Sequence, residues 1–328
     1  MSHYELVPKC IKQLINYRKF FDVMQLSVDL DIYSKMEYPI TVKHLSNELE
    51  IDEQFTEYFL TVLTKFGFVD VIMSGKDPLY ANSNISRQYL NSQSVMYLGK
   101  ELFDEIETGA ILQKYVTQGP ANRYITKDYW SREVLNKIAS VSLLGGVQYT
   151  VKKVDLSGRY RLLDVGGGHG LYSIFFTKKY SNLQAWVLDY PEVTEITKEF
   201  IDKYNAQDRV KLIAEDYKNF RAQKSFDVVF ISNVTASYND LLELLAKSKN
   251  WLTTGGLMIL RNYVTDINVD AWSSLNTLER YARRGKKGIT SQQLEAALQG
   301  NGFADTKRLC EGDGIIILQG LKIRSVNR

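Results

Sequence analysis

Three glycines at alternate positions of segment 166–170 lie between an apolar stretch and a helical pattern, and this junction constrains the fold more than any other feature. The apolar stretch, Tyr160–Val165, predicts a buried strand. Glycines let the backbone turn sharply and approach a flat ligand. A second predicted strand, Ala185–Leu188, ends in Asp189, where a carboxylate suits the two hydroxyls of a ribose. The sequence therefore predicts a strand–loop–helix unit that binds a ribose-containing ligand.

This loop differs from two common phosphate-binding loops. No Lys-Ser or Lys-Thr pair follows Gly170, as a P-loop requires, and Leu171 stands where G-x-G-x-x-G has its last glycine. A glycine-rich turn without a ligand is the remaining alternative. Asp189, at the end of the next strand, argues against that alternative.

Length and charge narrow the class of protein. The chain has 328 residues, enough for two domains, and its 41 basic and 38 acidic residues leave a net charge of +3, too balanced to indicate a nucleic-acid or membrane partner. Neither a membrane-spanning run nor a signal peptide is visible. Cys10 and Cys310 lie far apart, so we expect reduced thiols and a cytoplasmic location. With no C-x-x-C and no second histidine near His169, we expect no metal site.

The N-terminal part has the pattern of a winged helix. An amphipathic helix is predicted over Cys10–Met24, a second begins at Thr41 and a third at Asp52, and Phe68–Ile72 and Leu79–Ala81 form a hairpin.

A winged helix is often a DNA-binding module, but the third helix, 52–65, carries three acidic residues and one basic residue, whereas DNA binding needs clustered Lys and Arg. Its apolar stripe (Phe55, Phe59, Val62, Phe66), together with the first helix, exceeds what so small a domain can bury. We therefore expect a homodimer and no nucleic-acid partner.

The rest of the chain alternates short apolar runs with helical segments, which is typical of a parallel sheet covered on both faces. A tight glycine-containing segment joins the last two predicted strands and permits only a hairpin, so we expect one edge strand to run antiparallel. The predicted strands are Tyr160–Val165, Ala185–Leu188, Val210–Ile213, Phe226–Ile231, Gly256–Leu260, Phe303–Leu309 and Gly314–Leu321.

These segments resemble the two-domain O-methyltransferases that use S-adenosylmethionine (SAM), such as the caffeic-acid, hydroxyindole and polyketide types. The resemblance rests on D-x-G-x-G-x-G at 164–170, D-x-P-x-V at 189–193, a G-D-F-like element at 215–217, and L-x-x-G-G at 252–256. It implies an α/β fold: a Rossmann-like SAM-binding domain with a seven-stranded, mostly parallel sheet, and an N-terminal winged-helix dimerisation domain. We place these domains at 96–328 and 1–95, with a helical substrate-binding segment at 96–155.

The resemblance also implies where SAM binds and where S-adenosylhomocysteine forms. The glycines should approach the methionyl part, Asp189 the ribose, and Asp216 with Tyr217 the adenine. The implied cofactor-binding residues are Asp164, Gly166, Gly168, Gly170, Asp189, Tyr190, Asp216, Tyr217, Ser232 and Asn233.

The catalytic half of the family pattern is different in this chain. After the fourth strand the family carries an L-H-D-W-like segment whose histidine is the general base, and here Ala236 occupies that place. Ser232 stands where many relatives have a lysine, and Gln292 where an acidic residue would support the histidine. Tyr238 and Asp240 are candidate proton acceptors, although Asp240 also suits a helix N-terminus. Candidate walls of an aromatic acceptor pocket, or else plain core aromatics, are Tyr149, Tyr263, Trp272 and Tyr281.

We therefore predict a homodimeric SAM-dependent methyltransferase of secondary metabolism that acts on a small, aromatic metabolite without a histidine base. One alternative is a SAM-binding enzyme of the same fold with hydroxylation, decarboxylation or pericyclic chemistry. Another is a SAM-responsive DNA-binding regulator, against which the acidic third helix argues.

Overall fold

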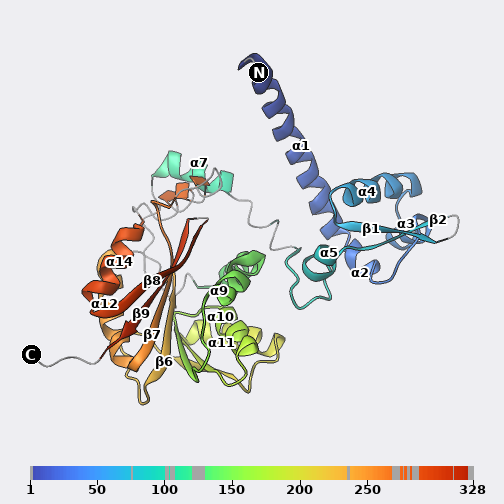
Figure 1. Ribbon diagram of the computed structural model, residues 1–328. Coiled ribbons are helices and arrows are strands. Elements are labelled where there is room, and N and C mark those ends of the chain that lie inside the picture. The colour runs from blue at the N-terminus through green and yellow to red at the C-terminus, as the bar shows by residue number, and fades with distance from the viewer. Residues whose placement is uncertain are drawn as a thin grey trace, which may run out of the picture. The chain divides into compact units, whose positions relative to one another are not determined.

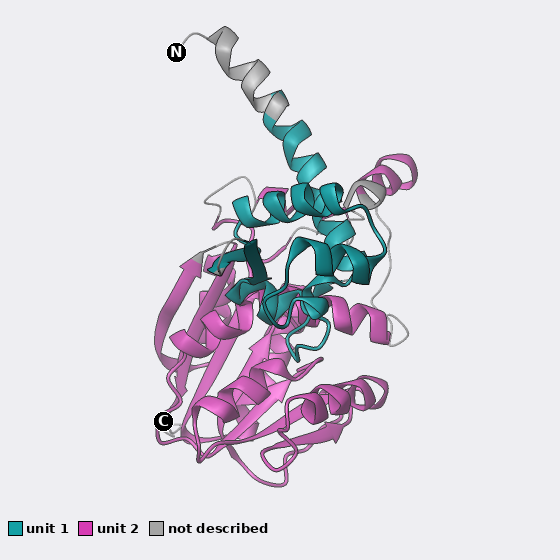
Figure 2. Ribbon diagram, turned by 90° about the vertical axis from the view of Figure 1, so that its right-hand side faces the viewer, with its two compact units in different colours: residues 1–106 teal, residues 107–328 magenta. Residues whose placement is uncertain are grey.

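The computed structural model describes residues 3–74, 77–99, 103, 108–119, 130–234, 237–267, 274–275, 277–278, 281–282, 288–312 and 314–323. The chain forms two compact units, Met1–Ile106 and Glu107–Arg328 (Figure 2). The division falls after Ile106, whereas the boundary predicted from the sequence lies after residue 95.

Unit 1 has the winged-helix layout that the sequence predicts (Figure 1). Two of its helices begin at the predicted caps, because Thr41 Oγ1 accepts a hydrogen bond from His44 N (3.2 Å) and Asp52 Oδ1 accepts one from Phe55 N (2.7 Å). Its elements are α1 (His3–Asp29), α2 (Ile32–Lys35), α3 (Val42–Leu49), α4 (Glu53–Lys65), the antiparallel strands β1 (Val69–Ser74) and β2 (Asp77–Asn82), and α5 (Asn84–Tyr89).

The apolar stripe of α4 divides between the core and the surface. Phe59 and Leu63 are buried, whereas Tyr58 and Phe66 are 65% and 54% exposed. On α1, Leu14 is likewise 67% exposed, and neighbouring apolar side chains share this exposure. Unit 1 therefore presents more apolar surface than scattered single residues would give.

Unit 2 is a seven-stranded sheet covered by helices on both faces (Figure 1). Figure 1 shows α12 and α14 over one face and α9, α10 and α11 over the other. The strand order is β5-β4-β3-β6-β7-β9-β8. The elements are α7 (Thr108–Gln118), α8 (Arg132–Val141), the π-helical turn η2 (Ser142–Gly146), α9 (Val147–Lys153), β3 (Arg161–Val165), α10 (Leu171–Lys179), β4 (Gln184–Asp189), α11 (Pro191–Lys203), β5 (Val210–Ala214), β6 (Phe226–Ser232), α12 (Tyr238–Trp251), β7 (Leu252–Tyr263), α14 (Ser291–Gly300), β8 (Phe303–Gly312) and β9 (Ile315–Lys322).

The position of the antiparallel strand differs from the prediction. β9 pairs antiparallel with both β7 and β8, so the antiparallel strand lies inside the sheet and the edge strand β8 runs parallel to the others. Ile316 and Ile317 on β9 are fully buried and need neighbours on both sides. Lys307 and Glu311 on β8 are exposed, and charged side chains suit an edge strand.

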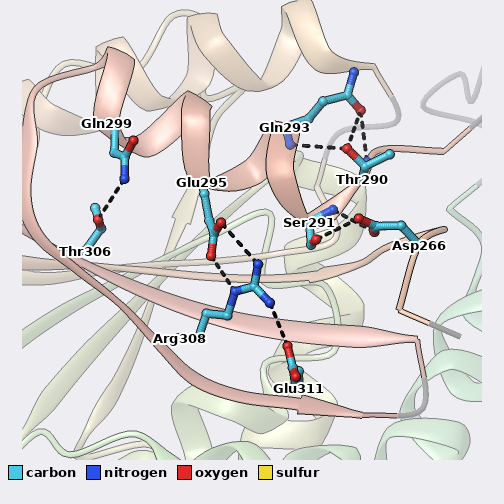
Figure 3. A network of polar contacts seen from close by, with 9 residues as sticks. All are labelled: Asp266, Thr290, Ser291, Gln293, Glu295, Gln299, Thr306, Arg308 and Glu311. Carbon is cyan, nitrogen blue, oxygen red and sulfur yellow. Dashed lines mark hydrogen bonds and ion pairs between the residues drawn. The ribbon is translucent and has the colours of Figure 1, made fainter. Parts of the chain in front are cut away.

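Polar contacts hold α14 to the sheet edge and to the loop after β7 (Figure 3). The Asp266 carboxylate accepts hydrogen bonds from Ser291 N and Ser291 Oγ, both at 2.7 Å. Arg308 on β8 forms ion pairs with Glu295 of α14 and with Glu311 (Figure 3). These contacts fix the start of α14, which closes one face of the sheet.

Candidate active site

The glycine loop between β3 and α10 has a backbone that only glycine adopts easily. Gly166, Gly168 and Gly170 have φ values of 62°, 54° and 70°. Space is also short, since a Cβ on Gly166 would lie 2.8 Å from Val234 Cγ2, and one on Gly170 would lie 2.8 Å from Thr197 Cγ2. Conformation and crowding therefore both account for glycine at these two positions.

Asp189 ends β4 and holds this loop. Its two carboxylate oxygens accept hydrogen bonds from Gly168 N and Tyr190 N, each at 2.8 Å. The side chain is partly exposed, and burial raises the pKa of its carboxyl group. The contact with Gly168 N joins the ends of β3 and β4, a role that was not predicted from the sequence. An acid at this spacing after a glycine loop is the only signal that the sequence offers for it.

Asp164 lies beneath the loop. It is 1% exposed, accepts a hydrogen bond from Ser173 Oγ at 2.8 Å, and its carboxyl carbon would lie 2.9 Å from a Cβ on Gly167. Burial raises its pKa to about 7. These contacts are all within the protein, so Asp164 supports the loop from below, and its predicted contact with a cofactor stays a prediction.

Further predicted cofactor-binding residues gather at the carboxyl ends of β4 and β5. Glu215 N donates to Asp189 O (2.9 Å), which brings the segment after β5 beside Asp189. Asp216 Oδ1 accepts a hydrogen bond from Lys218 N (2.9 Å), and Tyr217 beside it is partly buried. Burial and, to a smaller extent, the surrounding carboxylates raise the pKa of Tyr217 to about 12. The structure thus brings together a carboxylate pair and aromatic rings on this edge.

His169, within the loop, is locked as a neutral ring. It is 4% exposed, its Nδ1 accepts a hydrogen bond from Leu171 N (3.1 Å), and its Nε2 faces Ser142 Oγ (3.2 Å). Burial and, to a smaller extent, the charge of Arg261 lower its pKa to about 3. His169 therefore orders the start of α10 rather than accepting a proton.

The locked state of His169 predicts a pH-dependent stability. The pKa is about 3 in the folded protein and near 6.5 unfolded, so only the unfolded chain binds this proton between those pH values. The stabilisation is present above pH 6.5 and is lost as the pH falls, by about 2 kcal/mol between pH 7 and pH 5. Urea titrations at pH 7 and pH 5 measure the free energy of unfolding of both proteins. Its decrease from pH 7 to pH 5 should be about 2 kcal/mol larger in the wild type than in His169→Gln. Equal losses would mean that folded His169 is protonated.

The ends of β6 and β7 form the other half of the site. Asn233 Oδ1 accepts a hydrogen bond from Tyr263 N (2.9 Å), and Arg261 on β7 reaches Ser232 Oγ on β6 (3.4 Å). Arg261 is only 4% exposed and was not among the residues predicted from the sequence. The signal that could have found it is a single arginine after the apolar run Leu257–Leu260.

The predicted catalytic and acceptor-pocket residues are less well grouped. Asp240 Oδ2 accepts a hydrogen bond from Ser237 Oγ (2.6 Å), and Ser237 caps α12 through Asp240 N. This is the helix-terminus role that the sequence left open. Tyr238 packs partly buried against the core, and Tyr281, 44% exposed, stacks edge-on with Tyr115.

Tyr149 is 44% exposed and Tyr263 lies beside Arg261, its ring centre 5.6 Å from the guanidinium carbon. Ala236 and Trp272 lie outside the described residues. Among the side chains that the structure describes, no group of three or more His, Cys, Asp or Glu is placed to hold a metal ion. No described helix is long and apolar enough to cross a membrane.

Sequence comparisons support an enzyme family. A profile of the O-methyltransferase domain matches residues 100–304. An uncharacterised protein of Methanocaldococcus jannaschii is 26% identical over 282 residues, which cover 84% of this chain and 75% of that protein. The L-tyrosine C(3)-methyltransferase of Streptomyces lavendulae is 28% identical over 121 residues, 36% of this chain and only 33% of that enzyme.

Solved structures share the fold over nearly the whole chain. Human N-acetylserotonin methyltransferase in complex with SAM aligns with a TM-score of 0.73 at 17% identity, covering 99% of this chain and 100% of that one. The pyocyanin biosynthetic protein PhzM aligns with a TM-score of 0.75 at 16% identity, covering 96% and 99%. At these identities the likeness establishes the fold alone.

A mostly parallel sheet with a glycine loop after a central strand and a carboxylate after the next defines an α/β protein of the nucleoside-binding class. The family profile covers more than half of the chain, and the chain belongs to the O-methyltransferase family. It is thus a SAM-dependent methyltransferase, and the predicted family, fold class and cofactor are confirmed.

Proposed function

We propose that this enzyme transfers the methyl group of SAM to a small aromatic acceptor at the carboxyl ends of β3 to β7. The observation that carries the proposal is the glycine loop whose Gly168 N is held by Asp189. The residues present fit the cofactor, because the loop offers a side-chain-free surface and Asp189 keeps a partly exposed carboxylate beside it. Tyr190 and Tyr217 offer partly buried rings near Asp216, where an adenine would lie.

When bound, SAM would supply an electrophilic sulfonium methyl group, which the acceptor attacks in line as the S–CH3 bond breaks and S-adenosylhomocysteine leaves. The protein must therefore hold donor and acceptor aligned near contact distance, and such positioning alone lowers the barrier substantially. In our proposal the loop and Asp189 fix the donor, while aromatic side chains such as Tyr263 orient the acceptor.

We further propose that no histidine serves as the base. The resemblance of segment 233–240 to the family's L-H-D-W-like segment, with Ala236 where the histidine is expected, supports this proposal. Of the histidine side chains that the structure describes, His44 lies on α3 of unit 1 beside Glu48, and His169 is held neutral inside the glycine loop. A phenol, with a pKa of about 10, needs a base, whereas an amine, an activated carbon or an ionised phenol does not. The acceptor is then already nucleophilic, or Tyr238 or Asp240 takes its proton.

Methyl-labelled SAM tests this function. Incubation with aromatic metabolites should give a product whose mass increases by one labelled methyl group, and Ala236→His should not raise the rate. A loss of about 10²-fold in turnover in Tyr238→Phe or Asp240→Asn, with SAM binding kept, would identify that side chain as the proton acceptor. Near-normal turnover in both variants indicates an acceptor that needs no base. If the enzyme consumes a substrate in the presence of SAM without incorporating the methyl group, the result would instead favour hydroxylation, decarboxylation or pericyclic chemistry.

We also propose that unit 1 forms a homodimer through its exposed apolar side chains, with an interface above roughly 2,000 Å². Leu14 and Tyr17 on α1 are 67% and 66% exposed, an exposure that a second copy would remove. Light scattering should give a dimer mass for the wild type and a monomer mass for Leu14→Glu, because the interface would bury the new charge. Asn16→Glu adds the same charge to another face of α1 and should remain dimeric. A monomeric wild type at micromolar concentration would contradict the proposal.

A further inference from the structure

Arg261 is a buried cation at the carboxyl end of β7. Its side chain donates from Nε to Thr150 Oγ1 (3.2 Å) and from Nη1 to Ser232 Oγ (3.4 Å). The guanidinium carbon lies 5.4 Å from the ring centre of Tyr172 and 5.6 Å from that of Tyr263. All four neighbours are uncharged, so they orient the guanidinium without neutralising it.

This charge has no carboxylate partner in the described part of the chain. None of the ion pairs between described residues includes Arg261, although it is 4% exposed. A buried cation without a counter-ion is costly unless another group supplies the negative charge. Its field contributes to the lowered pKa of His169, as expected for an uncompensated positive charge.

The location points to a ligand as the missing partner. Nη2 is directed toward Gly146, since a Cβ built there would lie 3.4 Å from it, an ordinary contact distance. A guanidinium has five N–H donors in a planar fork, and the two described hydrogen bonds use only Nε and Nη1. The preferred partner of such a fork is a carboxylate. Ligands of open α/β sheets bind at this edge, just beyond the strand ends.

We propose that Arg261 binds a carboxylate of a ligand at the ends of β6 and β7. This proposal rests on the proposed function, because the cofactor and the acceptor named there are the two candidate sources of the carboxylate. One source is the amino-acid end of the cofactor, and the other is an aromatic acceptor that bears a carboxylate. Either ligand completes an ion pair that the protein leaves open.

Arg261→Met removes the charge and keeps much of the volume, and Arg261→Lys keeps the charge without the fork. Lys152→Met, on the exposed side of α9, is the charge-matched control. Binding is measured for S-adenosylhomocysteine against methylthioadenosine, which lacks the carboxylate. In the presence of S-adenosylhomocysteine, thermal stabilisation is measured for 4-hydroxybenzoate against 4-hydroxybenzyl alcohol. In each pair, the preference is the ratio of the affinity for the ligand with a carboxylate to the affinity for the ligand without one. We expect this ratio to fall at least tenfold in Arg261→Met for one of the two pairs, and to stay unchanged in Lys152→Met.

The pair that loses its preference identifies the source of the carboxylate. The ligand-free Arg261→Met variant should melt at the same temperature as the wild type or higher, since an unpaired charge has been removed. Both preferences intact in Arg261→Met would overturn the proposal at any melting temperature, and a lower melting temperature beside them would show a structural arginine. If Arg261→Met does not fold, unchanged preferences in Arg261→Lys overturn it instead. Failure of the wild type to bind S-adenosylhomocysteine would refute the proposed function. The comparison of 4-hydroxybenzoate with 4-hydroxybenzyl alcohol, made without S-adenosylhomocysteine, would then show whether Arg261 binds a carboxylate.

Discussion

Asp189→Ala should weaken the binding of SAM or S-adenosylhomocysteine ten- to a hundredfold in calorimetry. The removed carboxylate would no longer accept hydrogen bonds from the ribose, a loss of about 1.5–3 kcal/mol for a charged acceptor. It would also no longer accept the hydrogen bond from Gly168 N, so the loop would lose its link to β4. Both effects act at the ligand site and should add to the loss in affinity.

Asp227→Ala is the matched control for this experiment. Asp227 Oδ2 accepts hydrogen bonds from Tyr160 N and Arg161 N, both at 2.9 Å, at the amino end of β3. This variant also loses two backbone hydrogen bonds, but at the opposite end of the strand from the site. It should be less stable and bind the cofactor normally. Unchanged affinity in Asp189→Ala would refute the assignment of the ribose site.

Gly166→Ala should destabilise the protein and severely reduce cofactor binding. The added Cβ would lie 2.8 Å from Val234 Cγ2, at a φ of 62° that an alanine rarely adopts. The conformational cost of about 1–2 kcal/mol adds to an overpacking cost of about 1–3 kcal/mol. Urea titration and calorimetry with S-adenosylhomocysteine measure the two effects.

Gly158→Ala separates conformation from crowding. Gly158 has a φ of 72°, but a Cβ there would have no atom within 4 Å. This variant should show only the conformational cost and bind the cofactor as the wild type does. If both glycine variants behave alike, crowding at Val234 is not what restricts position 166.

The parts of the fold that depend on residues close together in the sequence could be predicted from it. Thr41 and Asp52 cap their helices as expected, because a cap depends only on residues within one turn. The glycine loop and Asp189 are likewise set by a strand–turn–helix unit that is continuous in sequence. Gly166 has a φ of 62°, a backbone angle that favours glycine, as expected for a sharp turn at this position.

Features that depend on distant packing were not readable in the same way. The insertion of β9 between β7 and β8 is decided by which strand buries Ile316 and Ile317, not by the turn that joins the hairpin. Arg261 looked like the polar end of a strand, and only its neighbours from α9 and β6 show that it is buried. Asp240 was ambiguous because a helix N-terminus and a catalytic site both favour an acid there.

The order of the last strands has a consequence for how the sheet opens. β8 has one backbone partner, β9, whereas β9 has two. β8 can detach from β9 while the rest of the sheet stays intact. When β9 detaches from β7, however, β8 also loses its connection to the rest of the sheet. Backbone amides of β8 that are bonded to β9 therefore exchange with solvent whenever this outer pair opens. Amides of β9 that are bonded to β7 are protected from that opening and can exchange more slowly. The edge of the sheet beside α14 thus has a built-in hierarchy of local opening free energies, lowest at the outermost strand.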